Sequence, residues 1–364
     1  MTTTLLRPRV FLLAMIFVVL AVFPYLYTLP FFSSFLDPFR TFQGTRFAIW
    51  LIIIMGLNLL TGYSGQISLG HGAFIAVGAY IAAILISDYS VPVFVAVLTA
   101  GLLAGVFGLL IGIPAIRLSG PYLAIATLAL VVLLPQALKH SLVDEWTGGS
   151  QGIILSTPRA PDSLRDLVND KQWLYYNCMV PAVIMTAMAW SLTRSRIGRA
   201  FIALRDSEVA AQQMGVHVPL YKITAFGLCA LYAGTGGALF VYVETVLGPT
   251  SFELNISLVM LVMLVLGGLA SILGSILAAI MLTVRIDMTD LLVKYLPFGE
   301  QIGIDESRTA LFGLLLIFAI IFTPTGIAGS IREGREKREA RRVAREVAEP
   351  SGPARLVRLL RRQG

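Results

Sequence analysis

Charged side chains are scarce in this chain: they make up 13% of its 364 residues, whereas 57% are hydrophobic and the mean hydropathy is +0.81. A soluble domain carries about 25% charged and roughly 45–50% apolar residues. A chain of this size has too much surface to hide so many apolar side chains inside one globule. The shortage of charge therefore excludes a water-soluble fold and leaves a polytopic helical membrane protein, whose spans need roughly 20 apolar residues each.

Lysine is rarer still, since the chain has only five and none of them follows a glycine. A phosphate-binding loop of the G-x-x-x-x-G-K type is therefore excluded, and with it a nucleotide site of that kind. Acidic side chains are equally scarce in the apolar runs, where Glu244, Asp287 and Asp290 lie only near segment ends. Proton- or sodium-driven carriers place ionisable groups at mid-membrane. We infer that this chain binds no cofactor and that its driving force comes from another subunit.

The 3 histidines and 2 cysteines are too scattered to form a chemical site. His71, His140 and His217 offer no zinc spacing. Cys178 and Cys229 lie in apolar runs and make no metal or redox spacing, so we interpret them as core residues. No order of serine, histidine and acid indicates a hydrolase either. We therefore predict no metal site, no catalytic residues and no enzymatic activity.

The net charge of +7 is concentrated at one end of the chain. Residues 330–364 contain 11 arginines and lysines against 5 acidic residues, and the rest of the chain is nearly neutral. This pattern favours a basic cytoplasmic tail near anionic membrane lipid, or a solvated tail without a task, over nucleic-acid binding. We predict a transmembrane domain at 1–330, a basic cytoplasmic tail at 331–364 and no nucleic-acid partner.

Ten apolar segments predict an all-α, polytopic integral membrane protein, with eight or nine spans as alternatives. The first segment is apolar from Val10 to Phe32 and has no small-residue cleavage site, so we interpret it as an uncleaved span. The others run at roughly 46–60, 70–86, 92–115, 120–138, 173–192, 223–245, 256–267, 274–292 and 308–328. Ten spans place both termini in the cytoplasm together with the basic tail and the loop 193–222, as the positive-inside rule favours.

Two of these segments, 46–60 and 256–267, are short and adjoin glycine-dense breaks at 61–65 and 267–270. Short segments interrupted by glycine are typical of broken helices that line a polar cavity. Glycines let the backbone turn and approach closely, and the exposed N–H groups of the next helix start can hold a carboxylate. Tight packing of helices by small residues is the alternative, and the residues alone favour neither.

The loop 193–222 is the only long polar stretch between spans on the predicted cytoplasmic side. We expect Asp206 or Ser207 to cap a short helix there. Glu208 favours the N-terminal dipole of that helix, and Gly215 ends it. The other face of this helix is apolar and carries Val209, Ala210 and Met214. Such a helix suits a groove on a partner protein, or it lies on the membrane surface.

At these residues the chain resembles the membrane permease subunit of bacterial ABC importers for branched-chain amino acids, the LivM type. The resemblance covers about 46–330, and four stretches carry it: 56–74, 120–128, 147–152 and the loop from Ser195 to Gly215. The first is similar to the family's most specific signature, and the loop is similar to the coupling loop that docks on the ATPase. The segment 267–275 departs from the family pattern, which has an extra glycine and a Gly-Pro there.

The resemblance implies a transport subunit for leucine, isoleucine and valine in the bacterial cytoplasmic (inner) membrane. It implies a heterodimer with a sister permease of the LivH type, two cytoplasmic ATPases that use the ATP, and a periplasmic substrate-binding protein. Urea, short amides or other neutral amino acids are alternative cargoes. A stand-alone channel or ion-coupled carrier is the alternative from a different class.

A zwitterionic aliphatic amino acid needs brief polar contacts along its pathway. Our candidates for these contacts are Tyr63, Ser64, Gln66, Ser68 and His71. In the coupling loop the resemblance implies contact with the ATPase through Arg199, Arg205, Glu208, Ala211 and Gly215. The stretch 147–152 is expected on the outer side, where it meets the binding protein or only closes a turn.

Overall fold

The computed structural model describes residues 38–118, 120–155, 159–161, 168–244 and 246–295, together with the single residues 313 and 329. The predicted N-terminal span and the tail 331–364 lie outside this part of the chain. Of the predicted span 308–328, only Gly313 is described. The number of ten spans, the two-part division of the chain and the cytoplasmic position of both termini therefore stay predictions.

The other eight predicted segments each coincide with a long helix. These helices are α2 (Pro38–Leu57), which the π-helix η2 (Asn58–Tyr63) continues, α3 (His71–Ser87), α4 (Val93–Ala115), α5 (Pro121–Leu138), α7 (Asp170–Arg194), α10 (Val218–Phe240), α11 (Leu254–Gly267) and α12 (Ile272–Tyr295). Five of the helical stretches, among them 42–63 and 93–115, are long and apolar enough to cross a membrane. The prediction of a polytopic helical protein is confirmed at this level.

Short elements connect the long helices. They are α6 (Asp144–Thr147), β1 (Ile153–Ile154), α8 (Arg196–Asp206), α9 (Glu208–Gln213), β2 (Val246–Leu247) and the 3-10 helix η4 (Pro249–Phe252). The strands β1 and β2 pair antiparallel, with Ile153 opposite Leu247 and Ile154 opposite Val246. The described residues are mostly helical, as predicted, apart from this ladder of two residue pairs, which joins segments too far apart in sequence for periodicity to reveal.

The helix α2 begins at Pro38, well before the predicted start at 46. Polar side chains lower the hydropathy of its first turns, which is why the sequence pattern starts late. Within the fold, however, Thr45 is fully buried and Arg46 forms an ion pair with Glu244. The prediction that this segment is short is therefore wrong, because helical backbone runs without interruption from Pro38 to Tyr63.

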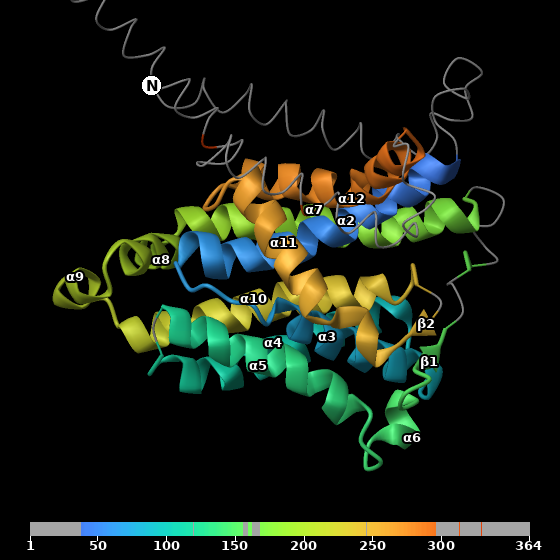
Figure 1. Cartoon of the computed structure of the whole chain (residues 1–364), viewed down its shortest axis with the longest axis horizontal. Coiled ribbons are helices and arrows are strands. Elements are labelled where there is room, and N and C mark those ends of the chain that lie inside the picture. Colours follow the sequence, from blue (N-terminus) through green and yellow to red (C-terminus); the bar gives the residue numbers. More distant parts are fainter. Residues whose placement is uncertain are drawn as a thin grey trace, which may run out of the picture.

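The long helices form two layers, α2, α7 and α12 in one and α3, α4, α5 and α10 in the other, with α11 running across them (Figure 1). The central helix α10 packs against α4, α3 and α2. Its contacts are made by small residues, as is common where membrane helices approach closely. At one point α10 and α3 are so close that a Cβ on Gly78 would meet the backbone of Gly234.

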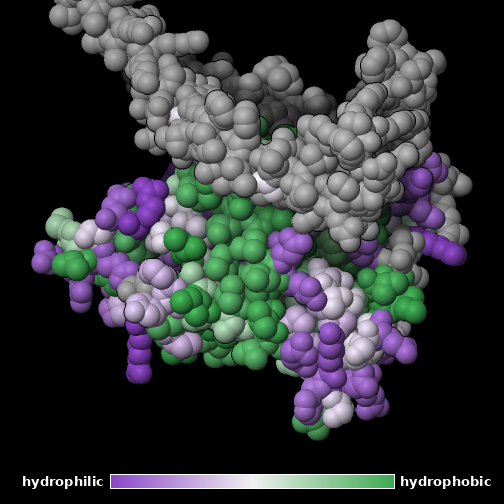
Figure 2. Space-filling view, in the orientation of Figure 1, coloured by the Kyte–Doolittle hydropathy of each residue, from purple (hydrophilic) through white to green (hydrophobic). Residues whose placement is uncertain are grey.

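The outward face of the second layer is apolar. On the side of the molecule that Figure 2 shows, a hydrophobic band runs over the middle of the described residues, with hydrophilic residues at both ends of the bundle. On α4 the inward residues are mostly alanine and glycine, whereas large apolar side chains point outward: Leu98, Leu102, Leu103, Val106, Leu109 and Leu110. A soluble protein would bury these leucines, so this distribution indicates a helix that faces lipid.

We predict that Gly78→Ala destabilises the bundle, because the new methyl group would meet the Gly234 backbone, which cannot move aside as a flexible side chain can. Overpacking of this kind costs about 1–3 kcal/mol. The measurement is the thermal unfolding midpoint of the detergent-purified protein. The matched control is Gly105→Ala on α4, whose Cβ would lie 3.2 Å from Leu231 Cβ and should cost less. Equal losses in the two variants would contradict this packing.

Candidate functional site at the helix breaks and the coupling segment

The first glycine-dense break is a change of helix type followed by irregular backbone. The α-helix changes to the π-helix η2 at Asn58, and all residues of η2 are buried. Residues 64–70 are not helical, Gly65 adopts a left-handed φ of 74°, and α3 begins at His71. Short π-helical turns occur often at functional sites. The predicted interruption is therefore confirmed, although it begins three residues later than predicted and follows a helix of full length.

The second break lies directly against the first. The fully buried Asn58 donates from Nδ2 to the carbonyl of Ser271 at 2.9 Å and to Ser275 Oγ at 2.7 Å. Its Oδ1 accepts from the N–H of Ala270 at 2.9 Å. Ala270 has a positive φ of 53° in the turn between α11 and α12. One amide side chain thus joins the two breaks, and a Cβ on Gly62 would lie 2.6 Å from Ala270 N.

The sequence predictions missed Asn58 as a functional residue. The signal was present, because it is an amide within an apolar run, immediately before a glycine-dense break. Its partners could not be read from the sequence, since Ser275 is 217 positions away.

Four of the predicted pathway residues lie together in the first break. Tyr63, Ser64, Gln66 and Ser68 are all buried. Ser64 Oγ donates to the Leu60 carbonyl at 2.7 Å and accepts from Gln66 Nε2 at 3.0 Å. Gln66 Oε1 is buried and has no hydrogen-bond partner among the described residues. A buried acceptor without a partner is uncommon, which makes Gln66 the member of this set best prepared to receive a donor.

His71, the fifth predicted pathway residue, connects three helices. It is fully buried, with Nε2 3.0 Å from the Ile53 carbonyl and Nδ1 3.4 Å from Cys229 Sγ. Because a carbonyl only accepts, Nε2 carries the proton, and Nδ1 accepts from the thiol. His71 therefore fastens the start of α3 to α2 and α10.

The N–H groups before and at the start of α3 have partners within the chain. Leu69 N donates to Thr127 Oγ1 at 3.0 Å, and Gly72 N donates to Ser257 Oγ at 2.8 Å. Gly70 N donates to Ser68 Oγ at 3.3 Å. These three N–H groups already donate within the chain, so they are not free to hold a carboxylate in this conformation. The segment therefore agrees with the alternative of tight helix packing. Contact between solute and the five candidate residues stays a prediction.

The coupling loop contains two capped helices at one end of the bundle. Ser195 Oγ accepts from Ile197 N at the start of α8, and Ser207 Oγ accepts from Ala210 N at the start of α9. The predicted short helix is confirmed: Ser207 rather than Asp206 caps it, and Gly215 follows its end with a φ of 81°. In Figure 1, α8 and α9 lie at the end of the bundle opposite to α6, β1 and β2.

Glu208, a predicted contact with the ATPase, is bound within its own chain. Its Oε1 lies 2.8 Å from Nζ of Lys222 on α10, and the Lys222 side chain is only 4% exposed. A buried ammonium group needs a partner, so this ion pair ties α9 to the central helix. The sequence predictions missed Lys222, although a lone lysine near the start of an apolar helix is a visible signal.

Arg205 joins the predicted coupling loop, which runs from Ser195 to Gly215, to the first break. Its Nη1 donates to the Gly62 carbonyl at 3.4 Å, and its Nε and Nη2 donate to Asp206 Oδ1. A Cβ on Gly65 would lie 2.7 Å from Arg205 Cγ, so glycine is required for this contact. Sequence alone could not show that a residue of the coupling loop lies against the glycine signature.

Of the two predicted coupling residues not yet described, one is buried and the other is exposed to solvent. Ala211 is 3% exposed and faces the bundle, whereas Arg199 is exposed and donates to the Arg194 carbonyl at 3.1 Å. The large apolar side chains that α9 and the following turn present outward are Val209, which is 68% exposed, and Met214, which is 85% exposed.

The chain is similar to known transport proteins over most of its length. The profile of the family described as branched-chain amino acid transport system / permease component matches residues 42–321. The high-affinity branched-chain amino acid transport system permease protein LivM of Escherichia coli (strain K12) is 31% identical over 316 residues, which cover 80% of this chain and 71% of that protein. The LivM protein of Salmonella typhimurium (strain LT2) is 30% identical over the same length.

A second kind of permease is also similar. The autoinducer 2 import system permease protein LsrC of Shigella flexneri is 28% identical over 287 residues, which cover 75% of each chain. No solved structure gives a significant match.

We predict that Glu208→Gln destabilises the protein by about 1–3 kcal/mol, because it leaves the buried Lys222 without its carboxylate. The double variant Lys222→Met, Glu208→Gln should lose less than Glu208→Gln alone, since it leaves no unpaired charge behind. Thermal unfolding of the purified protein measures both. The exposed Glu145→Gln is the matched control and should change nothing. If the loss of stability in the double variant equals the sum of the losses in Glu208→Gln and Lys222→Met, the pair does not tie α9 to α10.

Proposed function

Because the chain belongs to the family of branched-chain amino acid transport permease components, we propose that it is the membrane-spanning subunit of an ABC importer for leucine, isoleucine and valine. Family membership and the long apolar helices make it a multi-pass membrane protein. We place it in the bacterial inner membrane. Its role is transport rather than catalysis, and it binds no cofactor of its own.

The partners in this proposal are a sister permease of the LivH type, two cytoplasmic ATPases that hydrolyse the ATP, and a periplasmic binding protein that delivers the cargo. The LivM relatives carry branched-chain amino acid transport in their names. The name of the LsrC relative refers to autoinducer 2 import. Identity is higher to the LivM proteins, which favours an amino acid over other small neutral solutes.

The observation that carries the coupling role is the contact between Arg205 and the first break. The exposed side chains of Val209 and Met214 form an apolar tip that suits a groove on the ATPase. The ion pair between Glu208 and Lys222 then transfers a displacement of α9 to the central helix. Arg205 transfers it to Gly62 and to the irregular backbone that follows.

This scheme changes the roles first expected for three coupling residues, because Arg205, Glu208 and Ala211 all act inward. Glu208 and Ala211 act inward, as the joints between α9 and the bundle, and Gly215 ends the helix behind the apolar tip. Ligand-driven closure in other systems likewise moves rigid elements about a few irregular positions.

We predict that Met214→Asp greatly reduces both co-purification of the ATPases and ATP-driven uptake of leucine, because a carboxylate at the tip cannot enter an apolar groove. The measurement is uptake of radiolabelled leucine by proteoliposomes that contain the full transporter and its binding protein. The matched control is Leu142→Asp, which is 82% exposed at the opposite end of the bundle and should keep the ATPases bound. Leucine uptake by this chain reconstituted alone would contradict the proposed function.

A further inference from the structure

A cavity of about 340 Å³ lies between α2, the end of α10, η4, α11 and α12. Its size falls in the range of small-molecule sites. Arg46 lines it from α2, roughly 20 Å along the helix from Gly62, so the cavity is distant from the coupling segment. None of the five predicted pathway residues is among the described residues that line it.

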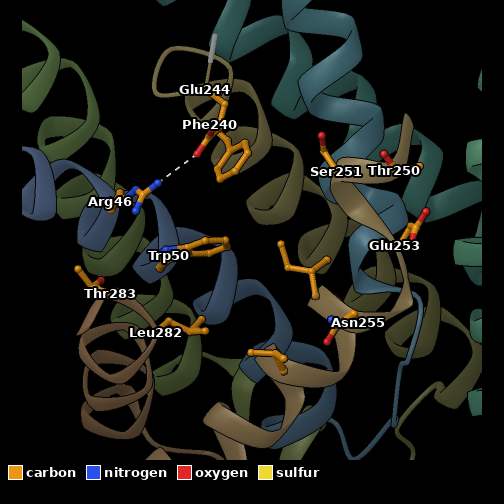
Figure 3. Close-up of a pocket in the computed structure, with 12 residues that line it drawn as sticks. Arg46, Trp50, Phe240, Glu244, Thr250, Ser251, Glu253, Asn255, Leu282 and Thr283 are labelled. Carbon is orange, nitrogen blue, oxygen red and sulfur yellow. Dashed lines mark hydrogen bonds and ion pairs between the residues drawn. The ribbon is translucent and has the colours of Figure 1, made fainter. Parts of the chain in front are cut away.

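Three charged side chains face this cavity. Arg46 Nη2 and Glu244 Oε1 form an ion pair at 3.2 Å, and both side chains are partly exposed. Glu253 also lines the cavity and forms no ion pair within the described ranges. In Figure 3 the pair of Arg46 and Glu244 lies on one side of the open space and Glu253 on the other. The described lining thus holds one cation and two carboxylates.

Of the other nine lining residues, five are apolar or aromatic and four are polar: Thr250, Ser251, Asn255 and Thr283. The ring of Trp50 projects into the cavity from α2, and its centroid lies 5.7 Å from that of Phe240 (Figure 3). Leu282 and Val259 add aliphatic surface. Apolar walls with a few convergent charges are the usual composition of a site for a small amphiphilic molecule.

We propose that this cavity binds a zwitterionic amino acid with an apolar side chain, and that the ligand opens the ion pair between Arg46 and Glu244. The ligand carboxylate pairs with Arg46, and its ammonium group pairs with Glu244 or Glu253. Its side chain lies against Trp50 and Phe240. The identity of the cargo rests on the proposed function, and the inference adds the residues that hold it.

Charge balance favours a zwitterion over the other cargo classes. A zwitterion replaces one protein ion pair by two ligand ion pairs and leaves the net charge of the cavity unchanged. An uncharged amide or urea cannot replace the ion pair, and an anion that pairs with Arg46 leaves both carboxylates without a counter-ion. A monocation can pair with Glu253 and leave the ion pair closed, so a ligand that opens the pair and balances both of its charges is a zwitterion. Partly exposed ion pairs contribute little to stability, so the pair can open readily.

The experiment uses the full transporter in nanodiscs and the emission of Trp50. The signal is the difference between the transporter with Trp50 and the same transporter with Trp50→Phe, which removes the contribution of all other tryptophans. The probes are L-leucine, 4-methylpentanoate, which lacks the ammonium group, and 3-methylbutylamine, which lacks the carboxylate. We expect a saturable response to leucine and binding at least tenfold weaker for each analogue, because each loses one charged contact.

Each variant should weaken the binding of leucine and spare the analogue that lacks the matching charged group, which gives a crossed pattern. A misfolded variant would weaken the binding of all three probes. Arg46→Gln should weaken leucine about tenfold or more and leave 3-methylbutylamine nearly unchanged, because that amine has no carboxylate to lose. The double variant Glu244→Gln, Glu253→Gln should weaken leucine similarly and leave 4-methylpentanoate no weaker. The exposed Asp88→Asn is the control and should not change binding of any probe.

The outcomes separate the site from the proposed function. If Trp50 does not respond in a transporter that imports leucine, the cavity is not the site and the proposed function stands. If Trp50 responds with the crossed pattern in a transporter that does not import leucine, the site stands and the proposed cargo is wrong. Equal weakening of all three probes by Arg46→Gln overturns the assignment of Arg46 to the carboxylate.

Discussion

The amide of Asn58 holds together the two places where helical backbone is interrupted. Backbone polar groups inside an apolar bundle must find partners within the protein, and an interruption leaves several of them free. Asn58 meets this constraint with three hydrogen bonds that span η2 and the turn between α11 and α12. Hydroxyl groups of Thr127 and Ser257 serve the start of α3 in the same way. Most of the irregular segment is therefore packed against the bundle, and Ile67 is its exposed large side chain.

From this packed segment a short series of contacts leads to the end of the bundle. Gly62 accepts from Arg205, and the missing side chain of Gly65 lets Arg205 lie directly on the backbone. The ion pair of Glu208 with Lys222 connects the same end to α10. A force applied to α9 therefore reaches both the central helix and the helix breaks. Under the proposed function, this arrangement would carry the movement of partner ATPases into the membrane domain.

Local features of the fold were predictable from the sequence, and long-range ones were not. Hydropathy located the described helices, and the cap at Ser207 with Gly215 behind it defined α9 because capping depends on neighbouring residues. The start of α2 at Pro38 was missed because polar side chains lower the hydropathy of its first turns, and the sequence does not show that Thr45 is buried or that Arg46 pairs with Glu244, 198 positions away. The partners of Asn58 and Lys222 escaped prediction for the same reason. Periodicity says which face of a helix is buried, but not which distant residue lies against it.

The central claim is that the coupling segment and the first helix break move as one unit, and distances between spin labels test it directly. Labels on the exposed positions Met214 and Ile67 report on that unit, and a third label on Leu142 reports on the opposite end of the bundle. When ATP is trapped in the full transporter, the distance from 214 to 67 should stay constant while the distance from 67 to 142 changes. A change between 214 and 67 with no change between 67 and 142 would contradict the account.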